Sequence, residues 1–81
     1  MKVRLRFFAS LRERLGTGEK DFTLAEGDTV EDLWQALCAE NGSLTEVGAS
    51  LSFAVNREYV DRKAVLSDGD EVALIPPVSG G

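Results

Sequence analysis

The stretch that decides the fold runs from Thr29 to Asn41 and has the sequence TVEDLWQALCAEN. Its apolar residues recur at i, i+3, i+4, i+7 and i+8, the spacing of one face of an α-helix: Val30, Leu33, Trp34, Leu37 and Cys38. Thr29 and Asp32 have the spacing of a capping box at the start of such a helix. The sequence therefore predicts one long amphipathic helix at about 29–41, with Trp34 and Cys38 in the core rather than in a chemical site.

The segments outside this helix alternate in polarity, which is typical of half-buried strands. In residues 2–8, Val3, Leu5 and Phe7 point to one side of the strand, and Lys2, Arg4 and Arg6 point to the other. Phe8 is an apolar exception on this charged side. Similar patterns predict strands at about 19–24, 51–55, 58–60 and 71–75. The first and last strands are the most apolar, so we expect them side by side near the middle of the sheet. If they are parallel, the C-terminus lies at the opposite end from the N-terminus.

A second, short helix is expected at about 10–15. Ser10 and Glu13 have the spacing of a capping box, and Gly16 is a suitable residue to end the helix. The pair Asn56-Arg57 tolerates a tight turn between the third and fourth strands. One main helix against a mixed sheet of about four or five strands predicts the α+β class. One side of that sheet is left open.

Composition limits the function. The chain has 81 residues and a net charge of −5, which argues against a nucleic-acid surface. It has no histidine and one cysteine, so the sequence predicts neither an internal disulfide nor a metal site. The N-terminal segment alternates and is neither a signal peptide nor a membrane span. We expect a cytoplasmic protein with no membrane partner.

The C-terminus is the most unusual chemical feature of the chain. We expect a domain at 1–75 followed by a flexible diglycine tail at 76–81, because Pro76 and Pro77 stop the last strand. Gly80 and Gly81 lack a Cβ, so they can pass through a narrow slot. With no catalytic constellation elsewhere, the Gly81 carboxylate is the candidate reactant, and the protein is predicted to be a carrier activated by other enzymes.

These features resemble a known family, the small subunits of molybdopterin synthase. The matching residues follow the same order along nearly the whole chain: Phe7-Phe8-Ala9, Leu11-Arg12-Glu13, Gly16, Thr29-Val30, Leu33, Leu37, Ala54-Val55-Asn56, Leu66-Ser67-Asp68-Gly69-Asp70-Glu71-Val72 and Pro76-Pro77-Val78-Ser79-Gly80-Gly81. The family consists of sulfur carriers with the ubiquitin-like β-grasp fold, and the resemblance implies that fold here.

The resemblance also implies a reaction cycle and partners. An adenylyltransferase related to ubiquitin-activating enzymes uses ATP to adenylate Gly81, and a sulfur donor converts the adenylate to a thiocarboxylate. The tail then delivers sulfur to a pterin precursor in the large synthase subunit, within a heterotetramer of two small and two large subunits. The chain itself binds no cofactor and acts as a non-catalytic subunit in the synthesis of molybdenum cofactor.

The alternation of side chains along the strands suggests which surface of the folded domain docks on its partners. Phe8, Tyr59 and Ile75 are predicted to form an apolar patch on the open face of the sheet, beside the tail residues Pro76, Pro77, Val78 and Ser79. Arg12, together with Arg4 and Arg6, is a candidate for polar contacts at the rim of this patch.

Three other functions fit the same pattern. The chain is a sulfur carrier of thiamine synthesis if its acceptor is a thiazole precursor. It is a ubiquitin-like modifier if Gly81 is joined to the lysines of target proteins. A plain interaction domain with an inert tail is a third alternative.

Overall fold

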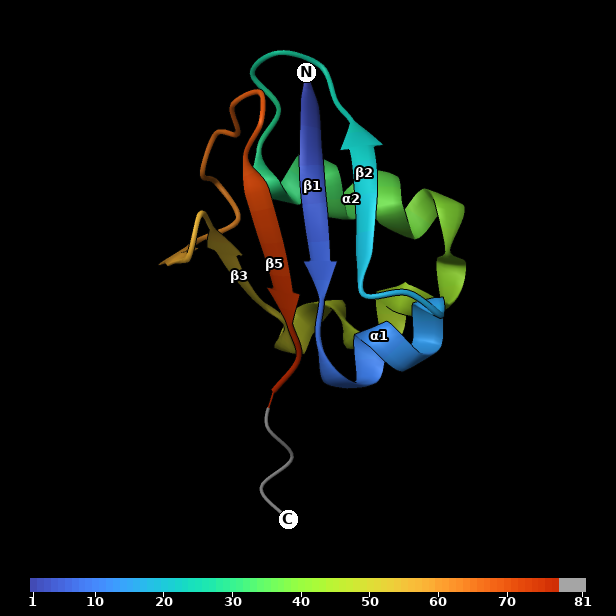
Figure 1. Ribbon diagram of the computed structural model, residues 1–81. Coiled ribbons are helices and arrows are strands. Elements are labelled where there is room, and N and C mark those ends of the chain that lie inside the picture. Colours follow the sequence, from blue (N-terminus) through green and yellow to red (C-terminus); the bar gives the residue numbers. More distant parts are fainter. Residues whose placement is uncertain (78–81) are drawn as a thin grey trace.

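The computed structural model describes residues 1–77, which form a five-stranded mixed sheet backed by helices (Figure 1). The elements in chain order are β1 (Lys2–Phe7), α1 (Ala9–Leu15), β2 (Glu19–Thr23), α2 (Val30–Glu40), the 3₁₀ helix η1 (Gly42–Ser50), β3 (Ser52–Val55), β4 (Glu58–Val60) and β5 (Glu71–Ile75). All five strands and both predicted helices lie within a residue or two of their expected positions.

The strand order across the sheet is β2-β1-β5-β3-β4. β1 and β5 are parallel neighbours, with Leu5 opposite Val72 and Phe7 opposite Leu74, and the other pairs are antiparallel. The prediction that the first and last strands lie side by side is therefore confirmed. Because they are parallel, β5 ends at the opposite end of the sheet from the N-terminus (Figure 1).

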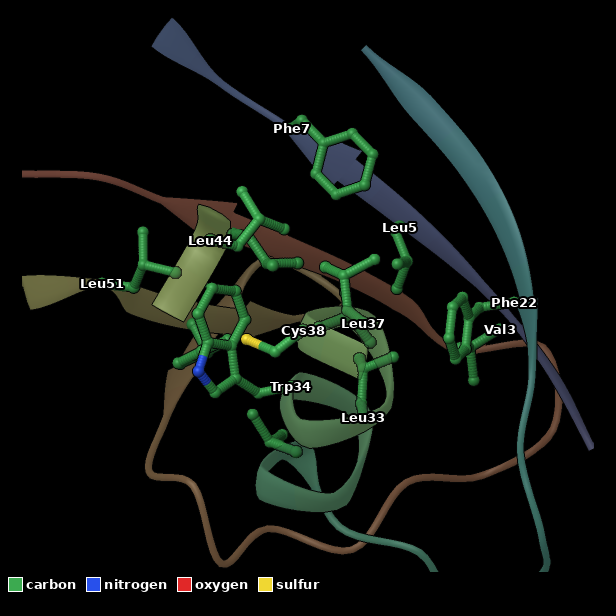
Figure 2. Packing of buried hydrophobic residues seen from close by; sticks show 14 of the residues in the cluster. Val3, Leu5, Phe7, Phe22, Leu33, Trp34, Leu37, Cys38, Leu44 and Leu51 are labelled. Carbon is green, nitrogen blue, oxygen red and sulfur yellow. The ribbon is translucent and has the colours of Figure 1, made fainter. Parts of the chain in front are cut away.

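Helix α2 forms as its sequence predicts and covers one face of the sheet. The Thr29 hydroxyl accepts the Asp32 N–H at 3.2 Å, and the Asp32 carboxylate accepts the Thr29 N–H at 2.9 Å, which completes the capping box. All five predicted apolar residues of α2 are buried. Figure 2 shows Leu33, Trp34, Leu37 and Cys38 packed with side chains of β1. The Trp34 ring meets Phe53 of β3 edge-on, with centroids 6.1 Å apart.

The predicted capping box of the short helix is wrong. α1 follows β1 directly, its N-cap is Phe8 in an extended conformation, and no side chain caps it. Ser10 lies inside the helix because the chain turns at Ala9, whose φ is +51°. The helix ends as expected at Gly16, with φ +73° and its N–H donating to Arg12 O at 3.0 Å.

Helix η1 connects α2 to β3. It packs beside α2, and its Leu44 and Gly48 are buried. The approach is close: a Cβ on Gly48 would lie 2.7 Å from Trp34 Nε1. Among residues 1–77, no helix is both long enough and apolar enough to cross a membrane.

Candidate docking face

No helix among residues 1–77 lies over the face of the sheet opposite α2 (Figure 1), and this open face carries the strand side chains that point away from α2. The strand register places Arg6 of β1 opposite Ala73 of β5, Ala73 opposite Ala54 of β3, and Ala54 opposite Tyr59 of β4. Since paired residues point to the same face, these four side chains form one row across the sheet. Ile75 lies two residues beyond Ala73, so it is on the same face.

A hollow of about 280 Å³ lies on this face, and we call it the open-face hollow. Its lining combines five apolar and three charged residues: Phe8, Ala54, Tyr59, Ala73, Ile75, Arg6, Arg57 and Glu71. Phe8 is 42% exposed and Tyr59 is 74% exposed. Exposed aromatic side chains beside a hollow are typical of residues that bind a partner.

The structure thus brings together the three residues of the predicted apolar patch, Phe8, Tyr59 and Ile75, around one hollow. Their role in binding a partner stays a prediction. Arg12 lies outside this hollow. It lines a neighbouring one of about 360 Å³, between β1, α1 and the turn before β2, which shares Arg6 and Phe8 with the first.

The predicted tail begins directly after this face. Pro76 follows β5 and is buried, whereas Pro77 is exposed. The predictions for Val78, Ser79, Gly80 and Gly81 lie outside the residues that the structure describes.

Ion pairs order the charged side of the open face. Arg4 lies 3.3 Å from Asp21, and Arg6 lies 3.6 Å from Glu19 and 3.8 Å from Glu71. The Arg6 guanidinium is also 5.9 Å from the centre of the Phe8 ring, within cation–π range. Exposed pairs of this kind add little stability. They do hold Arg6 beside Phe8 at the border of the two hollows.

Sequence reasoning missed four residues of the open-face hollow: Ala54, Ala73, Arg57 and Glu71. Ala54 is buried although it is not part of the main core cluster. Alanine side chains that point away from α2 on two central strands are, on their own, a weak sign of a binding surface. Their meaning depends on the register that places Ala54 and Ala73 opposite each other, which only the folded sheet gives.

Two features that could carry chemistry are a metal site and a reactive thiol, and the described residues bear on both. Within residues 1–77, no three His, Cys, Asp or Glu side chains are grouped so that they could hold a metal ion. Cys38 is buried, and its burial, followed by the negative charge of Glu31, raises the pKa of the thiol. A thiol in that state is a poor nucleophile.

Comparison with known proteins identifies a matching family and several relatives. The ThiS family model matches residues 5–81. The chain is 43% identical to a molybdopterin synthase sulfur carrier subunit from Chlamydomonas reinhardtii, over 100% of both chains. It is 40% identical to the molybdopterin synthase sulfur carrier subunit of Escherichia coli (strain K12), over 98% of this chain and 99% of the relative.

Solved structures share the architecture. SAMP1 from Haloferax volcanii, a small archaeal modifier protein, superposes with a TM-score of 0.88 at 28% identity, over 100% of both chains. A chain of the complex between subunits 1 and 2 of the molybdopterin-converting factor from Helicobacter pylori superposes with a TM-score of 0.72, also at 28% identity and over 100% of both chains. These likenesses confirm the predicted ubiquitin-like β-grasp fold.

Proposed function

Because the chain belongs to the ThiS family, we propose that it is a sulfur carrier in molybdopterin synthesis. The observation that carries this proposal is its similarity, from end to end, to sulfur carrier subunits of molybdopterin synthase from two distant organisms. The open-face hollow supports it, because a carrier needs a docking surface for its partners besides a reactive terminus.

The proposed chemistry takes place at the Gly81 carboxylate. A carboxylate is a poor acyl donor, since its oxygen is a poor leaving group. A separate adenylyltransferase transfers AMP from ATP to that oxygen and releases pyrophosphate. Hydrosulfide supplied by a sulfur donor then attacks the acyl carbon and forms a C–S bond while the bond to AMP breaks, so Gly81 carries a thiocarboxylate and AMP is released. Gly80 and Gly81 have no side chains to obstruct entry into a narrow active site.

The folded body then positions the terminus. β5 ends at Ile75, which lines the open-face hollow, and Pro76 and Pro77 follow directly. A partner bound at this hollow therefore lies next to the start of the tail. We propose that the large synthase subunit binds there, in a heterotetramer of two subunits of each kind, and that sulfur passes to the pterin precursor in its active site. The two-subunit complex of the Helicobacter pylori relative supports a large-subunit partner.

Intact mass spectrometry tests the chemical step. The protein is incubated with an adenylyltransferase of this pathway, ATP and a sulfur donor, and we expect a species with one sulfur in place of one oxygen, located at Gly81. A matched variant with one residue added after Gly81 should remain unmodified. If the unextended protein also stays unmodified, while a known carrier is converted in the same mixture, the proposal is wrong.

Alanine substitutions test the docking face. Phe8→Ala and Ile75→Ala should each weaken binding to the large subunit roughly 30-fold, the effect of a hot-spot residue worth about 2 kcal/mol. Val65 provides the matched control, because it is 65% exposed and does not line the open-face hollow. Val65→Ala should bind like the unmodified chain. Equal affinities for all four proteins, each correctly folded, would exclude this face as the docking site.

A modifier role is the second candidate, favoured by the full-length likeness to SAMP1. In that case a lysine amine rather than sulfur takes the Gly81 acyl group. Cell extracts would then contain conjugates of higher mass that disappear when a residue is added after Gly81. A sulfur carrier of thiamine synthesis would form the same thiocarboxylate but would deliver its sulfur to a thiazole precursor, so a transfer assay with the pterin precursor separates those two.

A further inference from the structure

We propose that Arg57 binds an acidic side chain of the large subunit at the docking face. The proposal rests on the function proposed above, since that function supplies the partner. It concerns a residue that is neither in the predicted apolar patch nor at its predicted rim.

The first observation is the backbone at the turn between β3 and β4. Asn56 and Arg57 have φ angles of +50° and +72°, so both central residues of this two-residue turn are left-handed. That geometry is typical of a type I′ turn, which favours asparagine followed by glycine. A residue with a Cβ is strained at the second position.

The fold explains Asn56 but not Arg57. The Asn56 side chain donates to Asp70 Oδ1 at 3.0 Å and accepts the Glu71 N–H at 3.1 Å, which joins the turn to the start of β5. Within residues 1–77, no hydrogen bond or ion pair involves the Arg57 side chain, whereas the guanidinium of Arg6 is engaged by Glu19 and Glu71. A strained arginine that the fold does not use suggests a functional role.

The position of Arg57 identifies what it binds. It lines the open-face hollow together with the apolar side chains of Phe8, Tyr59 and Ile75. The other charged residues of this lining, Arg6 and Glu71, already lie 3.8 Å from each other, so Arg57 is left to attract a negative group from outside. An apolar side chain of the partner fits the hollow, and a carboxylate beside it fits Arg57, whose planar guanidinium can bind a carboxylate through two hydrogen bonds.

The variant Arg57→Gly makes the turn Asn-Gly and separates the two effects. Removal of the strain should raise the Tm by about 4 °C or more. Loss of the guanidinium should weaken binding to the large subunit about tenfold or more at low ionic strength, with a smaller difference at high salt. Gain of stability together with loss of affinity is not expected of a residue with a purely structural role.

Two control variants complete the design. Arg57→Lys keeps the charge and should bind more tightly than Arg57→Gly. Lys63→Ala removes the same charge from an exposed loop residue that does not line the hollow, and it should bind like the unmodified chain.

The outcomes distinguish this inference from the proposed function. If Phe8→Ala weakens binding while Arg57→Gly binds normally, the role of Arg57 is wrong and the docking face stands. If Arg57→Gly lowers the Tm, the argument from backbone strain is wrong. If the unmodified chain does not bind the large subunit at all, the proposed function fails and this inference fails with it.

Discussion

Gly48→Ala should destabilise the protein strongly for a change of one methyl group. A Cβ at this position would lie 2.7 Å from Trp34 Nε1 and 3.0 Å from two further ring carbons. Trp34 is only 4% exposed and packs against Phe53, so the ring has little room to move away. Gly48 is also held from the other side, because its carbonyl accepts a hydrogen bond from Arg62.

The size of the effect follows from two opposing contributions. Overpacking of a core by an added methyl group costs about 1–3 kcal/mol. Replacement of glycine by alanine restricts the unfolded chain and returns about 0.4–1 kcal/mol. The midpoints of these two ranges give a net loss of about 1.3 kcal/mol, which lowers the Tm of a domain of this size by roughly 5–10 °C.

Urea and thermal unfolding measure this change directly. Trp34 is the only tryptophan of the chain, so its fluorescence reports on the site of the clash, and far-UV circular dichroism reports on the whole fold. Gly42→Ala is the matched control, because Gly42 belongs to the same helix η1 and a Cβ there would meet nothing within 4 Å. Affinity for the large subunit should be unchanged below the Tm, since η1 lies on the helix side of the sheet. If Gly48→Ala unfolds like Gly42→Ala, the close approach of η1 to Trp34 does not limit stability.

Three further predictions concern the cap, an ion pair and the cysteine. Thr29→Ala should cost about 1 kcal/mol in urea unfolding because it removes the cap of α2, whereas Ser10→Ala should change stability by less than about 0.5 kcal/mol because Ser10 caps nothing. Hydrogen bonds from Gln35 and then Arg62 lower the pKa of Glu31, so the folded state binds this proton less readily than the unfolded state. The contribution of Glu31 to stability is therefore complete above its ordinary pKa and is lost as the pH falls through the lowered one. The urea midpoint of Glu31→Gln should fall less steeply on acidification than that of the unmodified chain, and parallel curves would contradict this. Burial raises the pKa of Cys38, so a thiol reagent at neutral pH should react slowly with the folded protein and quickly in denaturant; equal rates would show that the thiol is accessible.

Local sequence patterns were sufficient for most of the secondary structure. The period of α2 and the side-chain pattern of its capping box are local properties, and they predicted both the buried face and the N-cap Thr29. The cap of α1 could not be found in this way. The position of Phe8 as N-cap depends on how far β1 continues, and that is decided by its pairing with β2 and β5 rather than by Ser10 and Glu13.

The candidate site likewise contains residues that could be predicted from the sequence and residues that could not. The alternation of side chains along single strands was enough to identify Phe8, Tyr59 and Ile75 as apolar residues that point away from α2. The roles of Ala54, Ala73 and Arg57 were not predictable, because residues far apart in sequence become neighbours only through the register of β5 with β3 and β4.

The sequence by itself determined the periodic elements, the outward side chains and the end of β5 at two prolines, since each of these depends on residues within one or two turns of the chain. The tertiary structure alone decided that the outward side chains of several strands surround one hollow and that Arg57 lies at its border in a left-handed turn. The physical reason is that hydrogen bonding between strands fixes which residues face each other, and no local pattern contains that register.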